Sequence, residues 1–240
     1  MQENKQEKEP HYLGHRKRLK ERFLSDEGKS MPDYELLELL LCMAIPRKDV
    51  KEKAKDLIKH FGSFNKVITA TQQNLKDYGL SENVIVALKL VTTAAIKISW
   101  LELNEKETPV ISNYDYMIDY CKASMAHLDH EEFRIILLNA KLEVIKEHLL
   151  QKGSINGVQI HPREVLKTVL NTNATSVILT HNHPGGKSEP SRNDIVLTKQ
   201  IVEILNAAGI VVFDHIIISE NSYYSFRDNH LIKNDLPKIY

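Results

Sequence analysis

The chain has 240 residues, which is enough for one large domain or two small ones. It carries 32 Lys and Arg residues against 32 Asp and Glu residues, so its formal net charge is zero. This balance argues against a chain-wide attraction to nucleic acid. The share of hydrophobic residues, 42%, is ordinary for a soluble globular protein.

The chain shows no sign of secretion, redox chemistry or membrane insertion. Its two cysteines, Cys42 and Cys121, stand far apart and form no C-x-x-C pair, which argues against a zinc ribbon or a thioredoxin-like site. The N-terminal segment 1–23 has no apolar core of the signal-peptide type. We recognise no apolar run of membrane-spanning length and therefore expect a cytoplasmic protein that does not enter a membrane.

The first half of the chain has the pattern of a helical domain. Residues 1–13 are polar and are expected to form a mobile tail. Residues 14–107 have apolar side chains at helical spacing and should form one all-helical domain. A charged stretch over 102–108 is a candidate linker. The clearest helices are expected over residues 33–41, 48–60, 64–70, 71–78 and about 81–103.

Within this helical half, the segment 75–90 (LKDYGLSENVIVALKL) resembles a helix-hairpin-helix. In that element a Gly-x-Gly turn offers backbone N–H groups to DNA phosphates. Gly79 is present here, but Ser81 stands at the position of the second glycine. The resemblance therefore implies the fold of the element and weakens its phosphate-binding role.

The second half, residues 108–240, alternates between strand and helix patterns. Such alternation is typical of an α/β or α+β domain. We expect helices near 114–126, 162–171 and 191–208. Strands are expected over 133–138, 142–150, 176–180, 210–219 and 222–226, the first two as a hairpin.

The segment 178–194 (ILTHNHPGGKSEPSRND) concentrates polar residues after an apolar run. His181 and His183 are two residues apart, so their side chains project to the same side of an extended chain. Ser191 has the type of a helix N-cap, and Asp194 would lie in the first turn of that helix. A helix start folded back on the strand end would therefore bring Asp194 to the two imidazoles.

Two imidazole nitrogens and one carboxylate oxygen leave a fourth tetrahedral position for water, which is the arrangement of a catalytic zinc site. Zinc lowers the pKa of its bound water to about 7 and so supplies a nucleophile at neutral pH. The sequence predicts one Zn²⁺ per chain, bound by His181, His183 and Asp194. The alternative for Ser191 and Asp194 is a capping pair that only starts a helix.

A catalytic site of this kind also needs an acid that accepts and returns a proton. Glu131 and Glu132 lie at the start of a predicted strand and would face opposite sides. Glu132 shares its side with Arg134, so an ion pair explains it. Glu131 shares its side with Phe133 and other apolar residues, where desolvation favours a proton-transferring role near neutral pH. Glu131 is therefore the preferred acid/base, and Glu132 is the alternative.

A second pair of polar residues, Asp214 and His215, lies in the run VVFDHIIIS. We expect them to begin a strand and to make local hydrogen bonds, so they are left outside the site. The alternative is that His215 orients a metal ligand.

The pattern His181-x-His183-Pro184, followed by Ser191-x-x-Asp194, resembles the JAMM metallopeptidase motif of MPN or JAB domains. The wider runs THNHPGGKSEPSRNDIVLTKQIVEI, GVQIHPREV and VVFDHIIIS look like the RadC-type bacterial branch. The resemblance implies an MPN/JAMM-like domain with a small mixed sheet flanked by helices over 108–240. It also implies that the helical part is similar to the RadC N-terminal domain.

The family resemblance also implies roles for individual residues. His181, His183 and Asp194 would bind zinc, Glu131 would act as acid/base, and Ser191 would stabilise the oxyanion. The expected activity is zinc-dependent hydrolysis of an amide, peptide or isopeptide bond in a peptide or protein-like substrate. The alternative is a DNA-associated protein, as the repair-related RadC name suggests, in which the helical domain binds DNA weakly and the metal site is structural or nucleolytic.

Overall fold

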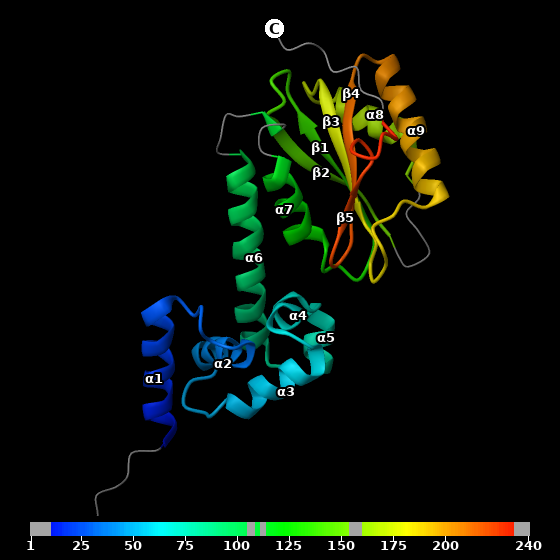
Figure 1. Ribbon diagram of the computed structural model, residues 1–240. Coiled ribbons are helices and arrows are strands. Elements are labelled where there is room, and N and C mark those ends of the chain that lie inside the picture. Colours follow the sequence, from blue (N-terminus) through cyan, green and yellow to red (C-terminus); the bar gives the residue numbers. More distant parts are fainter. Residues whose placement is uncertain (1–10, 105–108, 111–113, 154–159, 233–240) are drawn as a thin grey trace, which may run out of the picture. The chain divides into compact units, whose positions relative to one another are not determined.

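The computed structural model describes residues 11–104, 109–110, 114–153 and 160–232 (Figure 1). Its contacts divide the chain into two compact units, Met1–Ala94 and Ala95–Tyr240. Most of the predicted tail, residues 1–10, and most of the predicted linker, residues 105–108, lie outside the described residues. The helix at the start of the chain begins at His11.

The first unit is all-helical, as predicted. Its core is a cluster of buried aliphatic side chains, among them Leu37, Leu57 and Leu88, which the 3.6-residue spacing places on facing helix surfaces. Two short helices start at side-chain caps, where Ser63 and Thr71 each accept a backbone N–H three residues on. The helices are α1 (His11–Asp26), α2 (Asp33–Ala44), α3 (Lys51–Phe61), α4 (Phe64–Thr69), α5 (Gln72–Asp77) and α6 (Glu82–Asn104).

The turn between α5 and α6 has the shape of the predicted helical hairpin. Gly79 has φ +88°, a left-handed conformation that strains any residue with a Cβ. The backbone N–H groups of Gly79 and Leu80 donate to the carbonyls of Lys76 and Leu75. These two turn amides are therefore already bonded within the hairpin.

Helix α6 is long and apolar enough to cross a membrane by length and composition alone, with a mean hydropathy of 1.8. The expectation that no apolar run reaches this length was therefore wrong. The helix also supplies buried side chains to the core of each unit, Val84 and Leu88 to the first and Leu103 to the second. Only 22% of its apolar window is buried, and a single helix that passes this length and composition test is weak evidence for a membrane span.

The second unit is built around one five-stranded sheet with the order β2-β1-β3-β4-β5 (Figure 1). The β3–β4 pair is parallel and the other pairs are antiparallel, so the sheet is mixed. The elements are α7 (Tyr114–Met125), β1 (Glu132–Leu138), β2 (Val144–Lys152), α8 (Pro162–Leu170), β3 (Ser176–Asn182), α9 (Arg192–Ala207), β4 (Val211–Ile218) and β5 (Tyr223–Ser225).

Helices cover both faces of this sheet. Ile135 and Leu137 of β1 pack in one core with side chains of α8 and α9, whereas Ile136 and Leu138 pack in the other core with α7. Strands buried on both faces are apolar without alternation, which explains why β1 and β3 appear in the sequence as short continuous hydrophobic runs. The predicted fold class, a small mixed sheet flanked by helices after a helical region, is confirmed.

Candidate metal centre

The end of β3 positions the two histidines of the segment 178–194, His181 and His183. His181 lies within β3, where it pairs with Phe133 of β1 and with Ile217 of β4. It is buried, whereas His183, just past the strand end, is half-buried. The chain turns at Pro184 and the following glycines, and it enters α9 at Arg192.

The structure brings His181, His183 and Asp194 together. One nitrogen or oxygen atom of each lies within 4.8 Å of the other two. The two Nε2 atoms of His181 and His183 are 3.0 Å apart. Asp194 reaches both rings, with its Oδ1 3.5 Å from His181 Nε2 and its Oδ2 3.5 Å from His183 Nε2.

The hydrogen bonds behind the cluster fit a metal cation between the rings. His183 Nδ1 lies 2.9 Å from the carbonyl oxygen of Lys187. A carbonyl can only accept a hydrogen bond, so Nδ1 carries the proton and Nε2 presents its lone pair. Two imidazole nitrogens and a carboxylate oxygen that converge in this way form a donor set suited to zinc.

The electrostatics of the cluster also favour metal-binding protonation states. Burial lowers the pKa of His181 to about 4, so this ring is neutral at pH 7. Burial raises the pKa of Asp194, but hydrogen bonding by His183 and the proximity of His181 together hold it below its usual value. The hydrogen bond with Asp194 raises the pKa of His183. A metal ion would therefore compete with a proton at His183 in particular.

Ser191 and Asp194 form a complete capping box at the start of α9. The Ser191 hydroxyl oxygen accepts the backbone N–H of Asp194 at 3.2 Å, and Asp194 Oδ2 accepts the backbone N–H of Ser191 at 2.7 Å. The same carboxylate faces the two imidazoles. The capping interpretation and the metal-site interpretation are thus compatible, because the cap holds Asp194 in the position that the cluster needs.

The two glutamates at the start of β1 have different surroundings. Glu131 is half-buried and lines a pocket of about 390 Å³ together with the His181–His183–Asp194 cluster. Glu132 is buried and engaged elsewhere, with its Oε2 2.6 Å from Arg134 Nη2. His130 also contacts it, at 2.9 Å. The structure therefore brings Glu131, and not Glu132, to the pocket that holds the cluster.

His215 lies in contact with the cluster, although we expected it to make only local hydrogen bonds. Its Nε2 is 2.7 Å from Nδ1 of His181, and the ring is fully buried. That expectation was wrong because His215 lies in the middle of β4, parallel to β3, and not at a strand start. Its neighbour Asp214 does make a local bond, accepting the N–H of His215, and also binds Ser225.

The sequence offered the contact of His215 with a metal ligand only as an alternative, because no nearby pattern places the two rings together. It is 34 residues from His181 along the chain, and only the register of the parallel β3–β4 pair brings the two rings together. The sequence did contain one indication, the residue type. A histidine inside an apolar strand needs a hydrogen-bond partner when it is buried.

Comparison with known proteins identifies the family of the chain. Residues 111–231 match the RadC-like JAB domain. The chain is 41% identical to UPF0758 protein SPO0054 of Ruegeria pomeroyi over 220 residues, which cover 91% of this chain and 97% of that protein. The chain belongs to the RadC-like JAB family. The RadC-like domain includes the whole His181–His183–Asp194 cluster and Glu131.

Proposed function

We propose that this RadC-like protein is a zinc-dependent hydrolase of the JAMM metallopeptidase type. The observation that carries the proposal is the convergence of His181, His183 and Asp194 in a pocket also lined by Glu131 and Ser191. Two nitrogens and one oxygen are the protein ligands of many catalytic zinc sites, which keep a fourth position open. Zinc held there would lower the pKa of a bound water to about 7 and polarise a carbonyl.

Glu131 is the proposed acid/base. Glu131 lines the pocket together with Phe133, and among the described residues it takes no part in the ion pairs of Glu132 with His130 and Arg134. In the reaction it would accept a proton from the attacking water and return it to the leaving amine.

Ser191 is the proposed oxyanion donor. In the capping box its hydroxyl oxygen accepts the N–H of Asp194, which uses only an acceptor lone pair. The single O–H of Ser191 is therefore able to donate to the substrate oxygen as that oxygen gains negative charge.

The lining of the pocket supports a peptide-like substrate. Its walls include the apolar side chains of Phe133 and Leu197 beside the polar side chains of Lys187 and Asn193. Apolar walls with a few polar groups are the usual lining of a binding site that orients its ligand. The substrate class we propose is therefore a peptide or protein that presents an amide or isopeptide bond.

The test is metal-dependent peptide cleavage. Purified protein would be incubated with a peptide library that contains linear peptides and peptides branched at a lysine side chain, and the products would be read by mass spectrometry. We expect cleavage that stops on chelation and returns with Zn²⁺. Glu131→Gln should lower turnover by about 10²- to 10⁴-fold with its zinc retained. No zinc-dependent cleavage of any library member, or full activity in Glu131→Gln, would contradict the proposal.

A further inference from the structure

Behind the candidate metal centre, a buried chain of hydrogen bonds runs through three secondary-structure elements. His181 on β3 contacts His215 on β4 at 2.7 Å, between Nδ1 and Nε2. His215 Nδ1 then contacts the Thr198 hydroxyl on α9 at 2.6 Å. The Thr198 hydroxyl in turn donates to the backbone carbonyl of Asp194 at 2.5 Å. The chain therefore starts at one proposed ligand residue and ends at another.

The polarity of this chain follows from its last member. The Asp194 carbonyl can only accept, so the single hydroxyl proton of Thr198 points to it. The Thr198 oxygen must then accept from His215, which places the His215 proton on Nδ1. His215 Nε2 is left as an acceptor for the Nδ1–H of His181. This ordering leaves Nε2 of His181 unprotonated on the side of the cluster.

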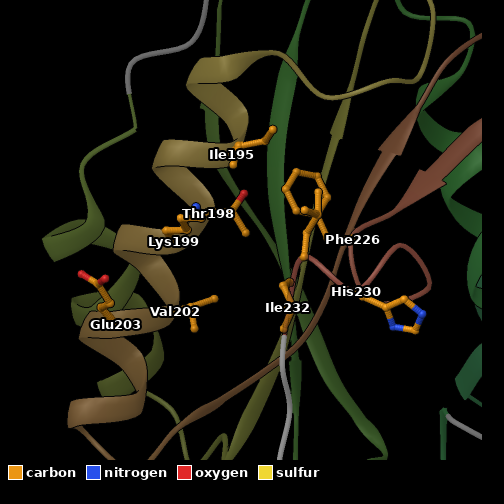
Figure 2. A pocket seen from close by; sticks show the side chains of 9 residues that line it. Ile195, Thr198, Lys199, Val202, Glu203, Phe226, His230 and Ile232 are labelled. Atoms are coloured by element: carbon orange, nitrogen blue, oxygen red, sulfur yellow. The ribbon is translucent and has the colours of Figure 1, made fainter.

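Aromatic packing holds the two rings in place. Phe133 stacks on His181 with an interplanar angle of 8° and a centroid distance of 5.6 Å. Phe226 stacks on His215 at 4.7 Å and 22°. Figure 2 shows Thr198 and Phe226 among the side chains that line a separate pocket of about 250 Å³. The rings therefore have little freedom to turn.

We propose that His215 is a positioning residue of the metal centre: it accepts the Nδ1–H of His181, fixes the tautomer of that ring, and so directs the His181 Nε2 lone pair to the metal. Thr198 sets the tautomer of His215 and ties it to the helix turn that carries Asp194. A ligating histidine usually donates its second N–H to a carboxylate, a carbonyl or water; here a neutral imidazole takes that place. The inference rests on the metal binding of the proposed function, but not on hydrolysis.

The chain offers a matched pair of variants for the test. Thr198 and Thr180 are both buried, at 2% and 0% exposure. The Thr198 hydroxyl is in the hydrogen-bond chain, whereas the Thr180 hydroxyl has no hydrogen-bond partner among the described residues. Thr198→Val and Thr180→Val each replace a buried hydroxyl by a methyl group, and only the first removes a hydrogen bond to His215.

The experiment measures Zn²⁺ affinity by competition with a chromophoric chelator, and the Co²⁺ absorption spectrum of each variant. We expect His215→Phe to weaken Zn²⁺ binding by about 10- to 100-fold and to change the Co²⁺ spectrum. His215→Gln should lose less Zn²⁺ affinity, because its amide oxygen can accept a hydrogen bond from His181 Nδ1. Thr198→Val should weaken binding in the same direction, and Thr180→Val should not.

Unfolding curves of the metal-free variants identify any variant that fails to fold. If His215→Phe fails to fold, the isosteric Thr198→Val still tests the proposal. Wild-type affinity and spectrum in a folded His215→Phe, or equal effects of Thr198→Val and Thr180→Val, would overturn the role of His215. A wild-type protein that binds Zn²⁺ but cleaves no peptide would contradict the proposed hydrolysis and leave the role of His215 standing.

Discussion

The two units of the chain differ in what they bury. Among the described residues, the helical unit buries two polar or charged side chains, Glu38 and Thr92, within a core of aliphatic residues. The C-terminal unit buries twelve, and these include His181, Thr198 and His215. A buried polar group costs free energy unless it is hydrogen-bonded, and three of these groups, His181, His215 and Thr198, form one hydrogen-bonded chain behind the candidate metal centre.

The helical unit shows the opposite pattern. Glu38 is bonded to His15 at 2.7 Å, and Thr92 donates to the carbonyl of Ile68 at 2.8 Å. These contacts join neighbouring helices and do not converge on one pocket. The proposed reactive site therefore lies in the second unit, where buried polar side chains meet the candidate metal centre.

The sharpest test of this comparison uses two helix caps of the same kind. Ser63 and Ser191 each accept a backbone N–H at 3.2 Å, one in the helical unit and one at the metal centre. Both alanine variants should lose about 1 kcal/mol of stability through the lost cap. Ser191→Ala alone should also lower turnover by about 100-fold, because it removes the oxyanion donor. Wild-type turnover in Ser191→Ala would show that Ser191 acts only as a helix cap.

A second prediction concerns acid sensitivity of the metal-free protein. Burial lowers the folded-state pKa of His181 to about 4 and that of His215 well below its usual value. The unfolded chain therefore binds more protons between about pH 6.5 and pH 4, and this stability is present above that range and lost as pH falls through it. His181 alone should contribute a loss of about 2 kcal/mol from pH 7 to pH 5.

His183 acts with the opposite sign. Its raised pKa gives stability that is present below its unfolded value and lost as pH rises through the folded one. Urea unfolding followed by fluorescence of the single tryptophan, Trp100, reports on the C-terminal unit, where this ring packs on Tyr120. An unfolding midpoint that stays the same or rises from pH 7 to pH 5 would contradict the account.

A smaller effect should separate the two adjacent glutamates. Glu132 is bonded to His130 and Arg134 in a buried network. Glu132→Gln should therefore lower stability by about 1–2 kcal/mol, because it weakens charge-assisted hydrogen bonds, and should leave turnover unchanged. If instead Glu132→Gln folded with wild-type stability and lost its activity, Glu132 and not Glu131 would be the acid/base.

How much of this site could be predicted from the sequence depends on how far apart the interacting residues are along the chain. The spacing of His181, His183 and Asp194 is local, since a strand end, a turn and a helix start lie within 14 residues, so the pattern itself indicated their convergence. The contact of His181 with His215 depends on strand register across 34 residues, which the pattern does not contain. The tautomer of His181 depends in turn on Thr198, a residue with no signal in the sequence.

The same reasoning explains the fold. The helices of the first unit were visible as helical periodicity, and the strands buried on both faces as short continuous apolar runs, because each pattern depends on neighbouring residues. Helix α6 was recognised as a helix, but the expectation that no apolar run reaches membrane-spanning length missed the apolar window within it. Its contribution to the cores of both units became visible only in the structure.

The central claim, a metal centre of His181, His183 and Asp194, is tested most directly by metal analysis of protein purified without chelator. Elemental analysis by mass spectrometry should find one zinc ion per wild-type chain. Folded His181→Ala should contain almost none, because it removes the buried ligand of the three. A wild-type protein without stoichiometric metal, or a His181→Ala variant with the same zinc content as wild type, would contradict the account.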